Sequence, residues 1–86
     1  YYVYYLLMSN GKVYTGSTSD LRRRFSEHKR GHVRTSGKYL PVRLIGYEAY
    51  ILKSDAQRRE KYLKTTEGKR YFRQQFRDII SQDKAA

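Results

Sequence analysis

The sequence of 86 residues contains no cysteine and only two histidines. These absences exclude a disulfide framework and a cysteine-based zinc site, and they leave too few histidines for a histidine-rich metal site. No apolar run approaches the roughly 18 residues of a membrane-spanning helix, and no signal peptide is recognisable. We therefore expect one small intracellular domain, cytoplasmic and associated with the nucleoid in a bacterium, with no membrane partner.

Acidic residues are also scarce. Eight Asp and Glu stand against nineteen Lys and Arg, which gives a net charge of +11 at pH 7. The basic excess is spread over both halves of the chain, so it belongs to the folded surface and not to a tail. It predicts a polyanionic partner, most simply nucleic acid, although an anionic membrane surface also fits. A merely solvated surface is disfavoured, because such a field would gather nucleic acid in any case.

Three segments have the composition of strands. Residues 1–8 are rich in tyrosine and aliphatic side chains, and Asn10-Gly11 is a strong signal for a tight hairpin turn. The returning strand covers residues 13–15 and is expected to stop at a loop over residues 16–19. Residues 42–50 form the third predicted strand. The first two strands are therefore expected to pair as an antiparallel hairpin.

Three segments are predicted to be helices. The first covers about residues 20–30 and is capped by Ser19 or Asp20. The second covers 54–64 and opens with a capping box in Ser-Asp-Ala-Gln. The third starts at Thr65 or Thr66 and carries apolar side chains at helical spacing to residue 80. The element order is β-β-α-β-α-α, a small mixed α/β (α+β) domain over residues 1–80 with a frayed tail over 81–86.

Ten of the thirteen aromatic residues are tyrosines. Tyr2 and Tyr4 share one face of the first strand, and Tyr14 lies near the end of the second. Cross-strand packing accounts for most strand tyrosines. The alternative is that some phenols line a cleft, where they could carry protons or donate hydrogen bonds to phosphate.

One arginine of the run at 22–24 is aimed inward. Arg24 falls on the helix face that carries Leu21, Phe25 and His28. The conservative interpretation is a snorkelling arginine beside a half-buried histidine. The functional interpretation is a guanidinium fork that binds a phosphate.

One carboxylate of the second predicted helix is also aimed inward. Glu60 shares a stripe with Ala56, Arg59 and Leu63. It could form an ion pair with Arg59, or it could be a ligand for Mg²⁺, which often takes only one or two protein carboxylates. Phenols, an inward arginine and an inward carboxylate on a basic domain are typical of metal-assisted phosphodiester hydrolysis.

The stretch Val3-Tyr4, Tyr14-Thr15-Gly16, Arg24, Glu60 resembles the GIY-YIG nuclease superfamily. That superfamily includes the incision module of a bacterial excision-repair nuclease, homing endonucleases and small stand-alone domains, and this chain looks most like the stand-alone branch. The resemblance covers about residues 1–75 and is most specific over 14–28. Tyr2 stands in place of the glycine of the first triplet, and Thr15 in place of the isoleucine of the second. No Asn follows Glu60, so Gln75 is a loose candidate for the position that an asparagine occupies in some relatives.

The resemblance implies a three-stranded antiparallel sheet flanked by three helices. It implies a metal-dependent endonuclease that hydrolyses DNA phosphodiester bonds, structure-selective or weakly sequence-specific, with a place in DNA repair. The main alternative is a basic module that binds nucleic acid without cutting it, and a more distant one is a structural or membrane-surface protein. Relatives that cut specific sites carry extra DNA-binding domains, so a targeting partner protein or a separate domain is expected. Oligomeric state is left open.

The resemblance also implies roles for individual residues. Glu60 would hold Mg²⁺ or Mn²⁺, and Arg24 would stabilise the charge of the transition state. Tyr4 would be the general base, assisted by Tyr14, and His28 would bind phosphate or relay a proton. Nucleic-acid contacts are expected from the glycine and serine of the second-triplet loop and from the outward bases that follow the first helix: Gly16, Ser17, Lys29, Arg30, Arg34 and Lys38.

Overall fold

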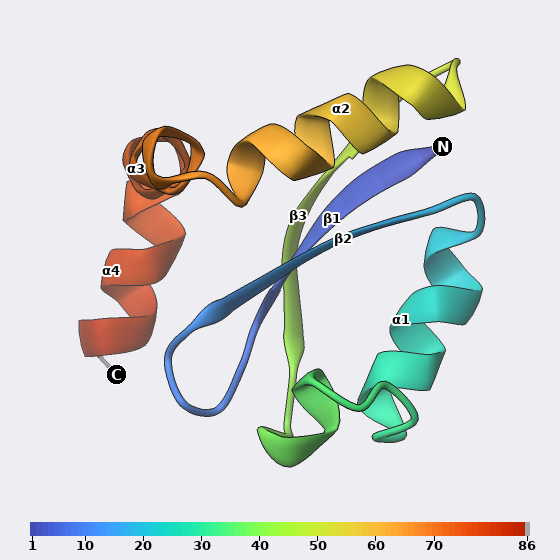
Figure 1. Ribbon diagram of the computed structural model, residues 1–86. Helices are drawn as coiled ribbons and strands as arrows, with labels where there is room; N and C mark the ends of the chain where they lie inside the picture. The colour runs from blue at the N-terminus through green and yellow to red at the C-terminus, as the bar shows by residue number, and fades with distance from the viewer. Residues whose placement is uncertain (86) are drawn as a thin grey trace.

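A three-stranded antiparallel sheet forms the centre of the protein (Figure 1). The computed structural model describes residues 1–85. The strands are β1 (Tyr2–Leu7), β2 (Val13–Thr18) and β3 (Arg43–Ala49), in the order β2-β1-β3. The central strand β1 therefore pairs on both sides, and Tyr4 lies opposite Gly16 of β2 and Tyr47 of β3. The predicted α+β class and element order are confirmed.

Strand β2 is longer than expected. The sequence predicts a loop from Gly16 onward, but Gly16, Ser17 and Thr18 continue the strand, with Ser17 opposite Val3 and Thr18 opposite Tyr2. Pairing with a buried central strand overrides the weak strand preference of glycine and serine. The expectation of a loop was wrong, and Tyr14-Thr15-Gly16 lies with Ser17 and Thr18 on the edge strand β2.

Helix α1 (Leu21–Lys29) covers one face of the sheet. The Asp20 side chain caps it by accepting a hydrogen bond from the Arg23 amide at 3.1 Å. Under α1, the side chains of Tyr4 and Leu6 form a buried apolar cluster with Phe25 packed against it. The connection to β3 is mostly irregular, as predicted, with one short 3-10 helix, η1 (Ser36–Lys38).

Helices α2 (Lys53–Leu63), α3 (Thr66–Gln75) and α4 (Arg77–Ala85) lie on the other side of the sheet (Figure 1). A second apolar cluster forms there from the alternate side chains of β1 and from these helices: Val3, Tyr5, Ala56, Leu63 and Phe72. Helix α2 begins two residues earlier than the capping box predicts: Leu52, not Ser54, is at the cap position, and no side chain caps the helix, so the predicted capping box was wrong. Thr65 caps α3, and its hydroxyl accepts a hydrogen bond from the Gly68 amide at 3.1 Å.

The last predicted helix is divided in two at Phe76, where the backbone leaves the helical conformation (φ −107°, ψ 22°). The break turns Phe76 onto the sheet, where its ring packs against Tyr5 with centroids 5.0 Å apart. Helix α4 includes residues 81–85, for which the sequence predicts a frayed tail, and Ala86 lies outside the described residues. Within the part of the chain that the structure describes, no helix is long and apolar enough to cross a membrane.

Candidate active site

Tyr4 is buried at the centre of the sheet, with only 1% of its surface exposed. Its hydroxyl forms a hydrogen bond with Nε2 of His28 at 2.8 Å. Its ring lies 6.2 Å, between centroids, from that of Tyr14 on the edge strand. Burial raises the pKa of Tyr4 to about 12, even though the Arg24 guanidinium acts in the opposite direction. Tyr4 is therefore a neutral phenol near pH 7.

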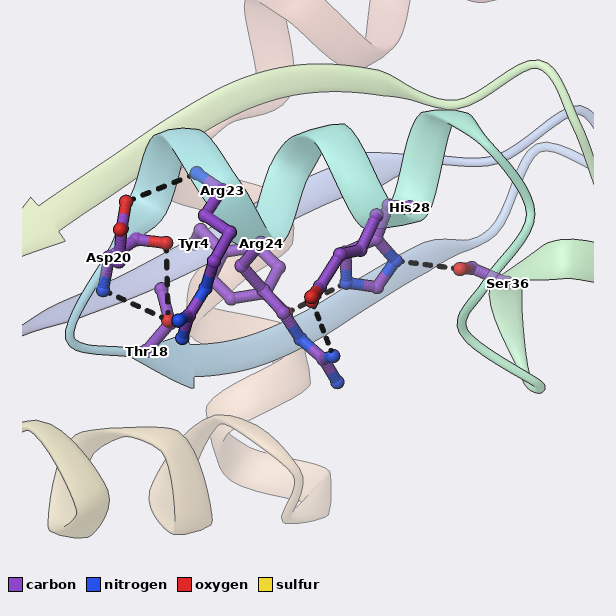
Figure 2. Close-up of polar contacts among 8 residues, drawn as sticks. Tyr4, Thr18, Asp20, Arg23, Arg24, His28 and Ser36 are labelled. Atoms are coloured by element: carbon purple, nitrogen blue, oxygen red, sulfur yellow. Dashed lines mark hydrogen bonds and ion pairs between the residues drawn. The ribbon is translucent and has the colours of Figure 1, made fainter.

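His28 links Tyr4 to the irregular segment after α1. The ring is fully buried, and its Nδ1 forms a hydrogen bond with Oγ of Ser36 at 2.7 Å. Burial, and then the charge of Arg24, lower the pKa of His28, so the imidazole is neutral and donates through one nitrogen while accepting through the other. Figure 2 shows this hydrogen-bonded series, Tyr4–His28–Ser36, between α1 and the sheet.

The arrangement bears on one of the two roles expected of His28, phosphate binding, and leaves proton relay as a prediction. Both ring nitrogens are occupied and no part of the ring meets solvent, so His28 cannot bind a phosphate directly. Its contacts are those of a group that positions Tyr4. Ser36 was missed by the sequence analysis, because a serine in a polar segment carries no periodic signal that it will be buried against a histidine.

Arg24 projects from α1 toward the edge strand β2 (Figure 2). Its side chain is 37% exposed, and its Nη1 donates a hydrogen bond to Oε1 of Glu27 at 3.0 Å. The contact with Glu27, followed by that with the Tyr4 hydroxyl, raises the pKa of Arg24. Arg24 is thus a held, permanently charged guanidinium that still reaches solvent.

Gly16 allows the two site tyrosines to approach the edge strand. A Cβ at this position would lie 2.6 Å from Oη of Tyr4 and 3.0 Å from a ring carbon of Tyr14. No side chain fits there unless the tyrosines move. Gly16 therefore makes room for the phenol of Tyr4, and this packing role is distinct from the expected approach of backbone to phosphate.

Glu60 projects from α2 and is 21% exposed. Ser17 donates a hydrogen bond to its Oε1 at 2.5 Å, and Nζ of Lys64 donates to its Oε2 at 2.7 Å. Burial alone would raise the pKa of Glu60, but the bonds from Lys64 and Ser17 outweigh it and lower the pKa. The suggested ion pair with Arg59 is not formed, because Arg59 binds Glu48 instead.

The two halves of the site meet at β2. Gly16 and Ser17 are consecutive on this edge strand, so they face opposite sides of the sheet. Gly16 contacts Tyr4 on the side of α1, and Ser17 holds Glu60 on the side of α2. The predicted site residues therefore gather around the free edge of β2, with Arg24 from one face and Glu60 from the other.

The donor set fits a metal ion that is only partly coordinated by protein. Among the side chains that the structure describes, those of residues 1–82, no group of three or more His, Cys, Asp or Glu is placed to enclose a metal. Glu60 supplies one ionised carboxylate, which is sufficient for Mg²⁺ or Mn²⁺ when waters and substrate phosphate complete the coordination shell. A preformed metal cage does not fit these residues.

The remaining predicted contacts are peripheral. The basic residues of the last turn of α1 and of the following segment are all exposed: Lys29, Arg30, Arg34 and Lys38. They extend the basic surface beyond the C-terminal end of α1. Gln75 lies exposed at the end of α3.

Comparison with known proteins places most of the chain in one family. Residues 1–74 match the model of the GIY-YIG catalytic domain. A UPF0213 protein of Streptococcus agalactiae serotype V is 40% identical over 67 residues, which are 73% of this chain and 73% of that protein. UPF0213 proteins of Cupriavidus pinatubonensis and Staphylococcus aureus strain Mu3 are each 38% identical, over 70% and 76% of this chain and 68% and 80% of their own lengths. No solved structure matches the chain significantly.

The matched range, residues 1–74, spans the whole of β2 and both helices that face it, α1 and α2. It also covers most of the chain, and the curated relatives match over most of their own length. The chain belongs to the GIY-YIG nuclease family.

Proposed function

We propose that the protein is a metal-dependent endonuclease that hydrolyses phosphodiester bonds in DNA. The observation that carries this proposal is the arrangement around β2: a solvent-reaching guanidinium and two tyrosines lie on one side of this edge strand, and an ionised carboxylate is bound to it from the other side. On a domain of charge +11, a carboxylate at such a site would repel the phosphate unless a cation lay between them. The combination suits a phosphate that is bound by Arg24 and by a metal ion on Glu60.

Tyr14 is the better candidate for the general base. The sequence suggests Tyr4 for this role, but the Tyr4 hydroxyl is buried, engaged by His28 and held neutral. Tyr14 lies beside it with a partly exposed side chain, so a water can reach it. In this mechanism Tyr4 orients the Arg24 guanidinium, and Tyr14 takes the proton of the attacking water.

Arg24 supplies fixed positive charge where the transition state becomes more negative. Glu27 holds one end of the guanidinium and the Tyr4 hydroxyl lies against it, so little reorganisation is needed when substrate binds. A donor of this kind is worth about 3 kcal/mol of transition-state stabilisation. The outward lysines and arginines would contact the backbone without reading bases, which favours structure-selective or weakly specific cleavage.

Glu60 would hold Mg²⁺ or Mn²⁺ through Oε2, the oxygen that accepts the hydrogen bond from Lys64 in this structure. A divalent ion there would supply Lewis-acid stabilisation of the phosphate and of the leaving oxygen. The Lys64–Glu60 ion pair also favours the alternative function, a DNA-binding module without catalysis, because it satisfies the carboxylate with no metal present. The two functions differ in whether a metal can displace the Lys64 ammonium.

The test is cleavage of labelled duplex, single-stranded and branched DNA with Mg²⁺, with Mn²⁺ and with EDTA. The proposal predicts internal cuts with either metal and none with EDTA, and a preference for branched substrates would favour a role in repair. Arg24→Ala should abolish cutting, whereas Arg23→Ala, an exposed neighbour on the same helix, should only weaken binding slightly. Binding of every substrate with no cutting under either metal would refute the nuclease and leave the binding module.

A further inference from the structure

An open groove of about 450 Å³ lies beside α1 on the Tyr4 face of the sheet. Leu21 and Phe25 of α1 line one side, and Leu44 and Tyr47 of β3 line the other. None of these residues belongs to the site around β2. Because Tyr47 is the strand partner of Tyr4, the groove lies next to the candidate active site, on its β3 side.

Aromatic side chains give the groove its character. Tyr47 is 57% exposed, and the edge of its ring meets the ring of Tyr2, with centroids 6.0 Å apart and an interplanar angle of 69°. Phe25 adds a third ring, and Nζ of Lys29 lies 5.0 Å from its centroid. Tyr2 stands where the family triplet has glycine, and its ring supports that of Tyr47.

The polar residues of the groove suit a base better than a phosphate. Asp20 lines it, and its carboxylate would repel a phosphate but can accept a hydrogen bond from the amino group of a base. Arg22 lies exposed at the same groove and, together with the net charge of +11, attracts the backbone on either side. Rings for stacking within a basic surface are the usual means of binding single strands.

We propose that this groove binds an unpaired base of a DNA strand, stacked on Tyr47, while the backbone of that strand passes the site around β2. In a duplex both faces of each base are covered by its neighbours, so only an unpaired base can enter. The inference rests on the proposed function for its choice of DNA and for the neighbouring phosphate site. Beyond the proposed function, such a groove would make the protein prefer DNA substrates with a single-stranded segment, such as flaps and branches.

The test is equilibrium binding in EDTA, so that no cleavage contributes. A labelled single strand, its duplex and a single-stranded RNA of the same sequence are titrated with wild type, Tyr47→Ala and Tyr47→Phe. Tyr39→Ala is the matched control, because Tyr39 is also exposed but lies near the opposite end of β1, where its carbonyl binds the Ser9 amide. Thermal melting of each variant establishes that it is folded.

Tyr47→Ala should weaken binding of the DNA single strand roughly 5- to 100-fold, the loss expected when one base loses its aromatic partner. Duplex affinity should change by less than about twofold, and Tyr47→Phe and Tyr39→Ala should bind like wild type. A 5-bromodeoxyuridine strand should crosslink to Tyr47 on irradiation. Equal losses for duplex and single strand, no loss, or tighter Tyr47-dependent binding of RNA would overturn the proposal.

The binding assay separates this inference from the proposed function. If wild type cuts DNA but Tyr47→Ala binds single strands normally, the groove proposal fails and the nuclease stands. If wild type cuts nothing but the selective loss is seen, the nuclease proposal fails and the groove remains a single-strand site.

Discussion

Replacing His28 with leucine tests whether the buried chain Tyr4–His28–Ser36 holds the site. His28→Leu puts an apolar side chain of similar volume in the place of the imidazole. The hydroxyls of Ser36 and Tyr4 both lose the ring nitrogen to which they are hydrogen-bonded. Each orphaned buried hydroxyl costs about 1–3 kcal/mol, and Tyr4 keeps its contact with Arg24. We expect the free energy of unfolding to fall by about 2–4 kcal/mol.

That loss is large for this chain. Domains have roughly 0.05–0.15 kcal/mol of stability per residue, which is about 4–13 kcal/mol for 86 residues. The expected fall corresponds to a decrease in melting temperature of roughly 10–25 °C. The matched control is His32→Leu, because His32 is exposed, and its effect should stay within about 0.5 kcal/mol.

A double-mutant cycle with Tyr4→Phe measures the contact itself. Urea denaturation of wild type, both single variants and the double variant should give a double variant less destabilised than the sum of the singles by about 1–2 kcal/mol. Additive effects, or an equal loss in His32→Leu, would refute the assigned hydrogen-bond chain.

The same residue predicts a pH dependence. Burial lowers the pKa of His28 below its value in the unfolded chain, so the unfolded state binds the proton more readily. The contribution of His28 is therefore complete above the unfolded pKa of about 6.5 and is lost as the pH falls through the window below it. Wild type and His32→Leu should lose stability between about pH 7 and 5, and His28→Leu should lose less.

Three further predictions concern other parts of the structure. Gly16→Ala should reduce cleavage at least about tenfold and lower the melting temperature, since its Cβ would collide with the Tyr4 hydroxyl; wild-type cleavage would contradict this packing. Lys64→Met should raise the pKa of Glu60 and tighten Mn²⁺ binding severalfold by calorimetry, whereas weaker Mn²⁺ binding would show that Lys64 assists the metal. Glu48→Gln should cost about 1–3 kcal/mol in urea denaturation with little effect on cleavage, because its carboxylate joins β3 to α2 away from β2; loss of cleavage in the folded variant would argue against that separation.

Much of the fold follows from local periodicity. Strand alternation predicts that Tyr4 and Tyr5 lie on opposite faces of the sheet, and helical spacing predicts that Arg24 and His28 share the inner face of α1; both are found. These features depend on a single element, and one buried face determines its register.

Features that depend on two distant elements were not predicted. The burial of Ser36 depends on how the irregular segment after α1 folds against His28, and the break at Phe76 depends on packing against the sheet. Arg59 binds Glu48 across α2 and β3 and leaves Glu60 to Lys64, although Arg59 is the immediate neighbour of Glu60 in sequence.

The most direct test of the central claim is the single-turnover rate of DNA cleavage by Glu60→Gln at saturating protein, with Mg²⁺ present. The substitution keeps an acceptor for Ser17 but removes the charge that would hold the metal. Glu67→Gln, an exposed carboxylate in the first turn of α3, is the control. The account predicts that Glu60→Gln lowers the rate at least about a hundredfold with DNA binding retained, and that Glu67→Gln cuts like wild type. Unchanged cleavage by Glu60→Gln would contradict it.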